Sequence, residues 1–247
     1  MSTILSRTQR ELIREAGSIL KDCMDSLSKE MKAGVSTKAL ERKAEGFIAS
    51  KDAKAAFRGY RGFPSGICSS RNEVVVHGIP RKDEILEKGD IISLDIGVKY
   101  RGYFADCART FAVGKISEEA KRLISVTKKS LDKGIEMAKS GNRVQDISWA
   151  IQSFVESNGF NVVRAFVGHG IGAKIHEEPE VPNFGRPNKG MVLEDGMVLA
   201  IEPMVNAGTS DVRILDDGWT AVTKDGRLSA HFEDTVIING EKAEIVT

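Results

Sequence analysis

The feature that most constrains this chain is a pair of apolar segments that each carry one aspartate and flank a tight turn. The segments read IISLDIGV and YFADCART, and the residues KYRG join them. Asp95 lies in the middle of the first segment and Asp106 lies in the second. Aspartate is depleted from buried strands, so two of them in one hairpin indicate more than a structural role.

The expected register of this hairpin brings the two aspartates together. A turn centred between Tyr100 and Arg101 pairs residues whose numbers sum to 201 (95 + 106). Asp95 would then stand directly opposite Asp106, with Cβ atoms roughly 4.5–5.5 Å apart. Two buried carboxylates at that separation need a shared proton or a cation. Alternatively, Asp95 ends a strand and faces water, and Asp106 pairs with Arg101 or Arg109.

The composition describes a globular chain without a dominant electrostatic field. Of its 247 residues, 41% are hydrophobic and 29% are charged, which suits one domain or two fused halves with a sizeable core. The net charge of +1 provides no strong attraction to DNA or to an anionic membrane. Residues 1–60 are mildly basic, which favours a solvated helical surface; a weak, transient contact with ribosomal RNA is the alternative.

The cysteines and the N-terminal segment indicate a cytoplasmic protein. Cys23, Cys68 and Cys107 form neither a CxxC motif nor a disulfide framework, which favours a reducing compartment. The N-terminal segment shows no secretion signal, and no apolar stretch approaches the roughly 20 residues that a membrane helix needs.

Helical periodicity surrounds a strand-rich segment. A capping box at Ser6 or Thr8 predicts a helix that begins near residue 7 and ends near Gly34. Further helices are predicted at about residues 36–50, 117–140 and 143–157, with strands between 57 and 112 and from residue 162 onward.

A faint internal repeat appears at an offset of 107 residues. In both halves an acid follows six residues after a matched glycine, which favours an ancient duplication over coincidence. The matched pairs are Gly34 with Gly141, Gly89 with Gly196, and Asp95 with Glu202. A duplication with halves of about 7–113 and 117–240 would direct Asp95 and Glu202 into one central cleft.

The repeat indicates Glu202 as a candidate metal ligand, and two further segments complete a candidate ligand set. His169 lies in VGHGIG, where small neighbours leave room around the ring, and Glu233 lies in SAHFEDTVII. With a neutral imidazole, the set Asp95, Asp106, His169, Glu202 and Glu233 carries a charge of −4, which two divalent cations would neutralise. Oxygen-rich ligation with one imidazole suits manganese, iron, cobalt or zinc, and two-metal sites promote hydrolysis.

Three histidines remain outside this set. His77 and His176 lie in the loop motifs HGIP and IHEEP, where we expect them to supply donors to a substrate and its oxyanion. A purely structural role is the alternative for each. His231 precedes Glu233 by two residues and is expected either to support a ligand or to lie on the rim of the site.

Five ordered segments together resemble the type I methionine aminopeptidases. They span nearly the whole chain and read NEVVVHGIP, DIGVKYRGYFADCARTF, GHGIGAKIHEEP, AIEPM and FEDT. The resemblance implies an α+β pita-bread fold, in which two pseudo-symmetric halves share a central curved, mainly antiparallel sheet with helices on its outer face. Residues 1–247 would form this single catalytic domain, similar to the minimal bacterial form.

The resemblance also implies an activity. The family removes the initiator methionine from nascent polypeptides when the second residue is small, by attack of a hydroxide activated by two divalent metals (cobalt, manganese, iron or zinc). We therefore expect nascent N-termini as partners, a monomer, and no binding to DNA or membranes. The alternatives are a Xaa-Pro aminopeptidase or creatinase-like hydrolase on the same fold, and a catalytically inactive pita-bread protein that binds RNA or protein.

The resemblance assigns roles to individual residues. His77 would contact the substrate, His176 would bond the scissile peptide and its oxyanion, and Glu202 would shuttle a proton as well as bind metal. The implied metal ligands are Asp95, Asp106, His169, Glu202 and Glu233.

A methionine pocket and a monovalent cation site are implied as well. The residues are Tyr60, Phe63, Cys68 and Trp219 for the pocket, and Asn72, Val74 and Ser229 for Na⁺ or K⁺. Two positions depart from the family pattern: Phe57 stands where some members have cysteine, and Asp234 stands where many have histidine.

Overall fold

Four α-helices lie outside a curved sheet in the computed structural model, which describes residues 4–247. The helices are α1 (Arg7–Ser28), α2 (Thr37–Ala49), α3 (Glu118–Met137) and α4 (Val144–Ser157), and a short 3-10 helix, η1, spans Tyr60–Gly62. The capping box predicted at Ser6 is present, with Gln9 as its partner. Helix α1 ends six residues before Gly34, because Leu27 is its last buried residue and Gly34 instead bonds to the carbonyl of Leu86.

The strands form one large sheet and two small ones. The large sheet has nine strands in the order β1-β4-β5-β14-β9-β7-β8, with β2 paired to β4 and β15 to β14; the small sheets are β13-β10-β6 and β11-β12-β3. The bounds are β1 Lys54–Ala55, β2 Cys68–Arg71, β3 Val74–Val76, β4 Ile91–Tyr100, β5 Tyr103–Ala112, β6 Asn161–Val162, β7 Gly168–Gly170, β8 Glu177–Val181, β9 Val198–Ile201, β10 Met204–Asn206, β11 Val212–Ile214, β12 Ala221–Thr223, β13 Ser229–His231, β14 Glu233–Asn239 and β15 Lys242–Ile245.

The β4–β5 hairpin forms as predicted, but its register differs from the predicted one: the numbers of paired residues sum to 203 instead of 201. Tyr100 pairs with Tyr103, so the turn consists of Arg101 and Gly102, whose φ angles of 46° and 92° fit a two-residue turn that matches the strand twist. The direct opposition of Asp95 and Asp106 was therefore wrong. Asp95 faces Ala108 and Asp106 faces Gly97, which makes the two aspartates diagonal neighbours on one face of the sheet.

In both halves a pair of helices, α1-α2 and α3-α4, precedes strands of the large sheet, and contacts recur at the predicted offset of 107. These are the hydrogen bonds Gly34 N to Leu86 O (2.8 Å) and Gly141 N to Leu193 O (2.9 Å), and the bridges Ser36–Ile85 and Arg143–Val192. The duplication and its boundaries stay predictions.

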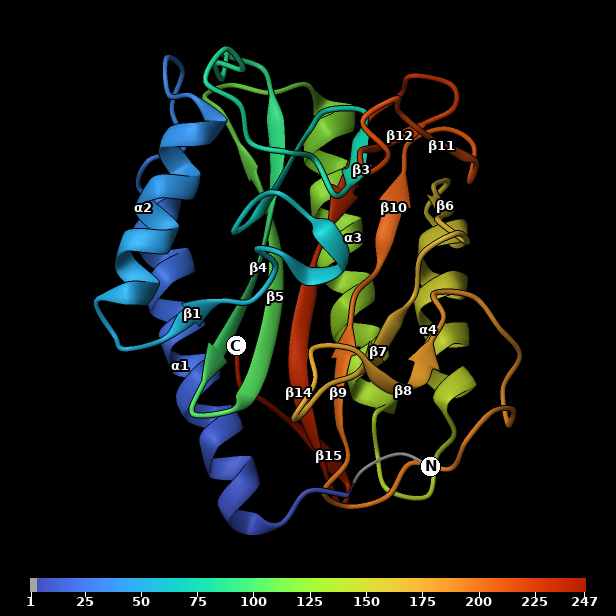
Figure 1. The fold of residues 1–247 in the computed structure, drawn as a ribbon. Coiled ribbons are helices and arrows are strands. Elements are labelled where there is room, and N and C mark those ends of the chain that lie inside the picture. The colour runs from blue at the N-terminus through green and yellow to red at the C-terminus, as the bar shows by residue number, and fades with distance from the viewer. Residues whose placement is uncertain (1–3) are drawn as a thin grey trace.

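The helices cover one face of the sheet (Figure 1). Alternate residues of β4, such as Ile92 and Leu94, pack with Leu20 of α1 and Leu40 of α2. In the second half, residues of α3 and α4 pack against Leu199 of β9 and its neighbours in the same way. Because side chains alternate along a strand, Asp95 points to the opposite face from Leu94.

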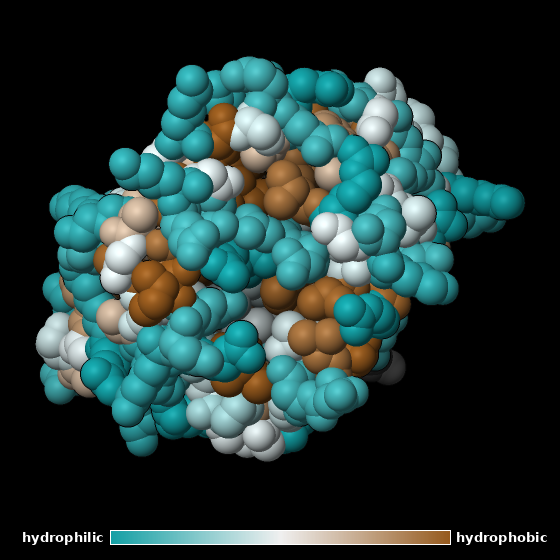
Figure 2. All heavy atoms as spheres, turned by 90° about the horizontal axis from the view of Figure 1, so that it is seen from above, coloured by the Kyte–Doolittle hydropathy of each residue, from teal (hydrophilic) through white to brown (hydrophobic). Residues whose placement is uncertain are grey.

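The surface is mostly hydrophilic on the face seen from above, where apolar side chains form separate patches (Figure 2). None of the helices within residues 4–247 is long and apolar enough to cross a membrane.

Candidate metal centre and active site

The register of the sheet places residues of the site in two rows that cross the strands, and small residues separate the longer side chains within each row. Asp95, Ala108 and Glu233 form one row across β4, β5 and β14. In the other row His169 pairs with Ala200, which pairs with Thr235. Alanines at the intervening positions leave the space between the longer side chains open.

Thr235 ties the second row to Asp106. Its hydroxyl accepts a hydrogen bond from the backbone N of Asp106 at 2.9 Å and donates to the Asp106 carbonyl at 2.8 Å. The strand that carries Asp106 is thereby fixed to the strand that carries Glu233.

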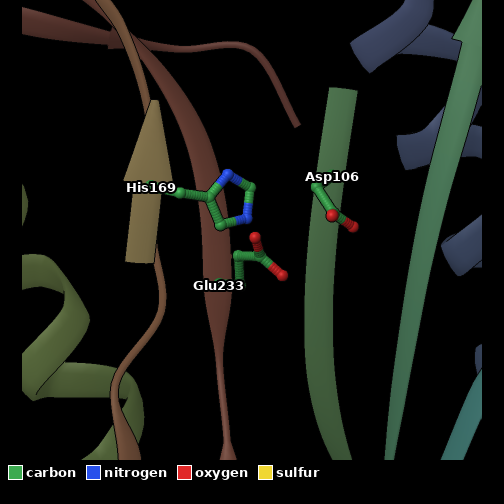
Figure 3. Close-up of side chains that lie close together, drawn as sticks. All are labelled: Asp106, His169 and Glu233. Carbon is green, nitrogen blue, oxygen red and sulfur yellow. The ribbon is translucent and has the colours of Figure 1, made fainter. Parts of the chain in front are cut away.

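Side chains from β5, β7 and β14 converge at the centre of the sheet. One ligand atom from each of Asp106, His169 and Glu233 lies within 4.8 Å of the others, and Figure 3 shows the ring of His169 beside the carboxylate of Glu233. Glu202, which follows β9, adds an oxygen 3.5 Å from His169 Nε2. Asp95 lines the same cavity, so all five residues of the candidate ligand set meet there.

The four carboxylates lie together without compensating cations: Asp106 and Glu233 are buried, and Asp95 and Glu202 are partly buried. Burial raises the pKa of Asp95 to about 7. Burial and the neighbouring carboxylates hold the pKa values of Asp106, Glu202 and Glu233 well above their usual range. Among residues 4–247, no lysine or arginine forms an ion pair with any of the four. Such a cluster is unfavourable unless protons or metal ions neutralise it.

The donor atoms of the cluster fit divalent cations. The buried oxygens Asp95 Oδ1, Asp106 Oδ1 and Glu233 Oε1 have no hydrogen-bond partner among the described residues. Carboxylate oxygens with one imidazole nitrogen are the ligands of hard and borderline divalent metals. His169 is prepared for this role, because its Nδ1 lies 3.0 Å from the Gly170 carbonyl, which directs Nε2 at the carboxylates.

The glycines beside His169 have a different role from the predicted one. A Cβ at position 168 would lie 2.4 Å from the Ala200 carbonyl oxygen, and one at position 170 would lie 2.2 Å from the Glu178 carbonyl oxygen. Gly168 and Gly170 therefore allow the backbones of β9 and β8 to approach β7 closely, rather than leaving room around the ring.

His77 and His176 line the cavity beside the acidic cluster. The ring of His176 lies between Tyr60 and His169, with centroid distances of 5.0 and 4.2 Å. Burial lowers the pKa of His176 to about 4 and also lowers that of His77, so both rings are neutral near pH 7 and each keeps one N–H donor. His77 packs edge-on against Phe166 at 5.2 Å, a neighbour that the sequence did not indicate.

An apolar part of the same cavity is formed by the predicted pocket residues. Tyr60, Phe63, Cys68 and Trp219 all line it, and the Phe63 and Trp219 rings meet edge to face at 5.2 Å. Phe57 lines it too, at the position where the family pattern varies. The cavity volume is about 160 Å³, smaller than the roughly 300–1,000 Å³ of sites for drug-sized ligands, and suits a single side chain.

The residues predicted to hold a monovalent cation lie outside this cavity. The Ser229 N–H donates to the Asn72 carbonyl at 2.8 Å, so these two are adjacent, and Val74 begins β3 close by in the chain.

Asp234 points away from the cluster and forms an ion pair with Arg109, whose Nη2 lies 2.5 Å from Asp234 Oδ1. Arg109 also donates to the carbonyl of Glu233. The alternative pairing of Asp106 with Arg109 is therefore wrong. The Arg109–Asp234 pair instead joins β5 to β14 beside two of the acidic residues.

Two residues of the site gave no signal in the sequence. Arg61 lines the cavity from η1 with a φ of 51°, and Asn183 donates to the Glu202 carbonyl at 3.0 Å. Neither belongs to a motif or a periodic pattern, so only the tertiary structure brings them to the site.

Comparisons with known proteins agree with this arrangement. The profile of Metallopeptidase family M24 matches residues 11–240. A methionine aminopeptidase of Clostridium acetobutylicum is 53% identical over 247 residues, covering 100% of this chain and 99% of the relative. The crystal structure of a methionine aminopeptidase from Thermotoga maritima has a TM-score of 0.99 at 43% identity and covers 100% of this chain and 99% of that one.

A more distant structure shows how widely the fold is shared. Prolidase from Pyrococcus furiosus has a TM-score of 0.80 at 22% identity, covering 99% of this chain and 65% of that one, which is a likeness of fold alone. The expected pita-bread fold is confirmed. By profile, identity and coverage, the chain belongs to the metallopeptidase family M24.

Proposed function

We propose that this protein is a methionine aminopeptidase that removes the initiator methionine from nascent polypeptides whose second residue is small. One observation carries the proposal: four carboxylates, two buried and two partly buried, converge with one imidazole in a cavity that is sized for one side chain and has an apolar part. The name of the 53% identical relative supports the same activity.

The proposed metal ligands are Asp95, Asp106, His169, Glu202 and Glu233. When bound, two divalent ions (cobalt, manganese, iron or zinc) would supply Lewis-acid activation of the scissile carbonyl and of the attacking water. Glu202 lies 3.5 Å from His169 Nε2 and lines the cavity, so its carboxylate would accept a proton from the attacking water and pass it to the leaving amine.

His176, which lines the cavity, would stabilise negative charge on the substrate. As a neutral ring it offers an N–H donor to the oxyanion of the tetrahedral intermediate. His77, which also lines the cavity, would donate to the substrate backbone. With the methionine in the cavity, the residue after it would lie beside these two rings, and we propose that this limits the second residue to a small one.

The apolar lining suits the methionine side chain. A thioether is polarisable and packs well against aromatic rings such as those of Phe63 and Trp219. Cys68 faces Asp95 across β2 and β4, so the pocket adjoins the acidic cluster directly. For the carbonyls of Asn72, Val74 and Ser229 we propose one Na⁺ or K⁺ ion.

The test is hydrolysis of short peptides by the metal-loaded protein. We expect turnover of Met-Ala-Ser and none of Ala-Pro. The reverse preference would identify a Xaa-Pro aminopeptidase. Binding of metal without turnover of either peptide would indicate an inactive member of the fold, and both outcomes contradict the proposal.

A further inference from the structure

His231 is a buried histidine that the proposed chemistry does not use. It is the last residue of β13, and it is 1% exposed and does not line the cavity. Its Nε2 atom has no hydrogen-bond partner among the described residues, yet lies 3.6 Å from Glu202 Oε2. A buried nitrogen without a hydrogen-bond partner is unfavourable, so the position of this nitrogen near a carboxylate indicates a function.

The backbone of His231 is held on both sides. The hydroxyl of Thr110 accepts from His231 N at 2.9 Å and donates to His231 O at 2.8 Å. His231 also pairs in register with Met204 on β10, two residues after Glu202. The backbone that carries the ring is therefore held by the strands of the site, so the ring stays beside Glu202.

Glu202 is flanked by two imidazoles. Its Oε1 lies 3.5 Å from Nε2 of His169, and its Oε2 lies 3.6 Å from Nε2 of His231. His169 faces the cavity, whereas His231 lies behind the carboxylate. One oxygen is thus directed toward the proposed metals and the other toward a nitrogen that can donate.

We propose that His231 is a positioning residue that donates its Nε2–H to Glu202 Oε2 and so holds the other oxygen toward the metal centre. The inference rests on the proposed function, because Glu202 serves there as metal ligand and proton carrier. A hydrogen bond of this kind requires a closure from 3.6 Å to about 2.8–2.9 Å, which a side-chain rotation supplies.

The test compares the full-length variants H231Q, H231N and H231L with the wild type. Glutamine carries an amide nitrogen near the position of the histidine Nε2. Asparagine is too short to place its nitrogen there, and leucine has no donor. Cobalt(II) is titrated into each metal-free protein to obtain the dissociation constant and the visible absorption spectrum, and kcat and KM are measured with Met-Ala-Ser.

We expect H231L and H231N to bind cobalt about 10- to 100-fold more weakly, or to lose a similar factor in kcat at unchanged KM. H231Q should keep most of the wild-type affinity and the wild-type spectrum. If H231L fails to fold, as its thermal unfolding would show, the comparison of H231Q with H231N still decides.

Equal losses in H231Q and H231N, or wild-type behaviour in H231L, would overturn the role of His231. A wild-type protein that binds cobalt and releases methionine keeps the proposed function intact in either case. A wild-type protein that binds no cobalt contradicts the proposed function and this inference together.

Discussion

At the scale of single residues, the site consists of ionisable side chains whose surroundings disfavour their charged forms. Asp106 and Glu233 are 3% and 2% exposed, which is costly for a carboxylate, and His169 is buried with its pKa lowered to about 3. Burial makes the acids retain protons and keeps the imidazole neutral. When divalent cations take the place of the protons, the carboxylates are ionised and the imidazole stays neutral, as metal ligation requires.

Replacing Glu202 by glutamine tests the proposed proton carrier. E202Q keeps the size of the side chain but removes its base, so we predict a fall in kcat of at least about 100-fold with Met-Ala-Ser. A cooperative thermal unfolding transition of the metal-free variant serves as the control for folding. Near-native turnover by the metal-loaded variant would remove Glu202 from the mechanism.

Replacing His176 by alanine tests the proposed oxyanion donor. Because the ring acts mainly in the transition state, we predict that H176A lowers kcat by about 10²–10³-fold and changes KM little. Its metal content should equal that of the wild type, since His176 is not a proposed ligand. A rise in KM at constant kcat would show that the ring only binds substrate.

The sequence could predict this set of residues because each has a local signal. A lone acid inside an apolar segment is rare, as at Asp95 and Glu202, and charge counting then requires a cation. Arg61 and Asn183 could not be found in this way, because they belong to no motif or periodic pattern and acquire a role only through tertiary contacts.

At the scale of secondary-structure elements, the close packing of β7 between β8 and β9 positions His169. Gly168 and Gly170 have no Cβ, so neighbouring carbonyls occupy that space. Any larger residue must move backbone atoms, and the imidazole would move with them.

A pair of glycine replacements tests this packing. We predict that G168A destabilises the protein by about 1–3 kcal/mol, because the new Cβ would meet the Ala200 carbonyl at 2.4 Å. The matched control is G46A in α2, where nothing lies within 4 Å and alanine should stabilise the helix by about 0.5–1 kcal/mol. Both are measured by urea unfolding, and equal effects at the two positions would contradict the close-packing account.

The bounds predicted for α2 and α4 agree with the structure to within one residue at each end. The hairpin register was wrong because the turn was centred one residue too early. The glycine at position 102 was the available signal, since a two-residue turn favours glycine at its second position. Pairing between distant strands, such as β5 with β14, depends on the whole sheet and left no local pattern.

At the scale of the whole molecule, two helix-covered halves meet at a buried acidic centre, so metal binding and stability should be linked. The metal-free protein holds four carboxylates with raised pKa values. The histidines of the site have lowered pKa values, which make the free energy of unfolding rise with pH. This opposes the contribution of the carboxylates only below about pH 6.5, the ordinary pKa of histidine.

We therefore predict that the metal-free protein loses stability as the pH rises from about 6.5 to 8. In this interval the folded protein binds more protons than the unfolded chain, so the free energy of unfolding falls with pH. Saturating divalent metal should remove most of this dependence. Melting temperatures measured across the interval check it, and a metal-free protein that becomes more stable with rising pH would contradict it.

The central claim is that residues from both halves of the sheet hold a pair of divalent ions. Anomalous diffraction from crystals of the metal-loaded protein tests it most directly. We predict two peaks roughly 3.5–4 Å apart, within coordinating distance of Asp95, Asp106, His169, Glu202 and Glu233. Crystals that contain metal but show no peak among these side chains would contradict the account.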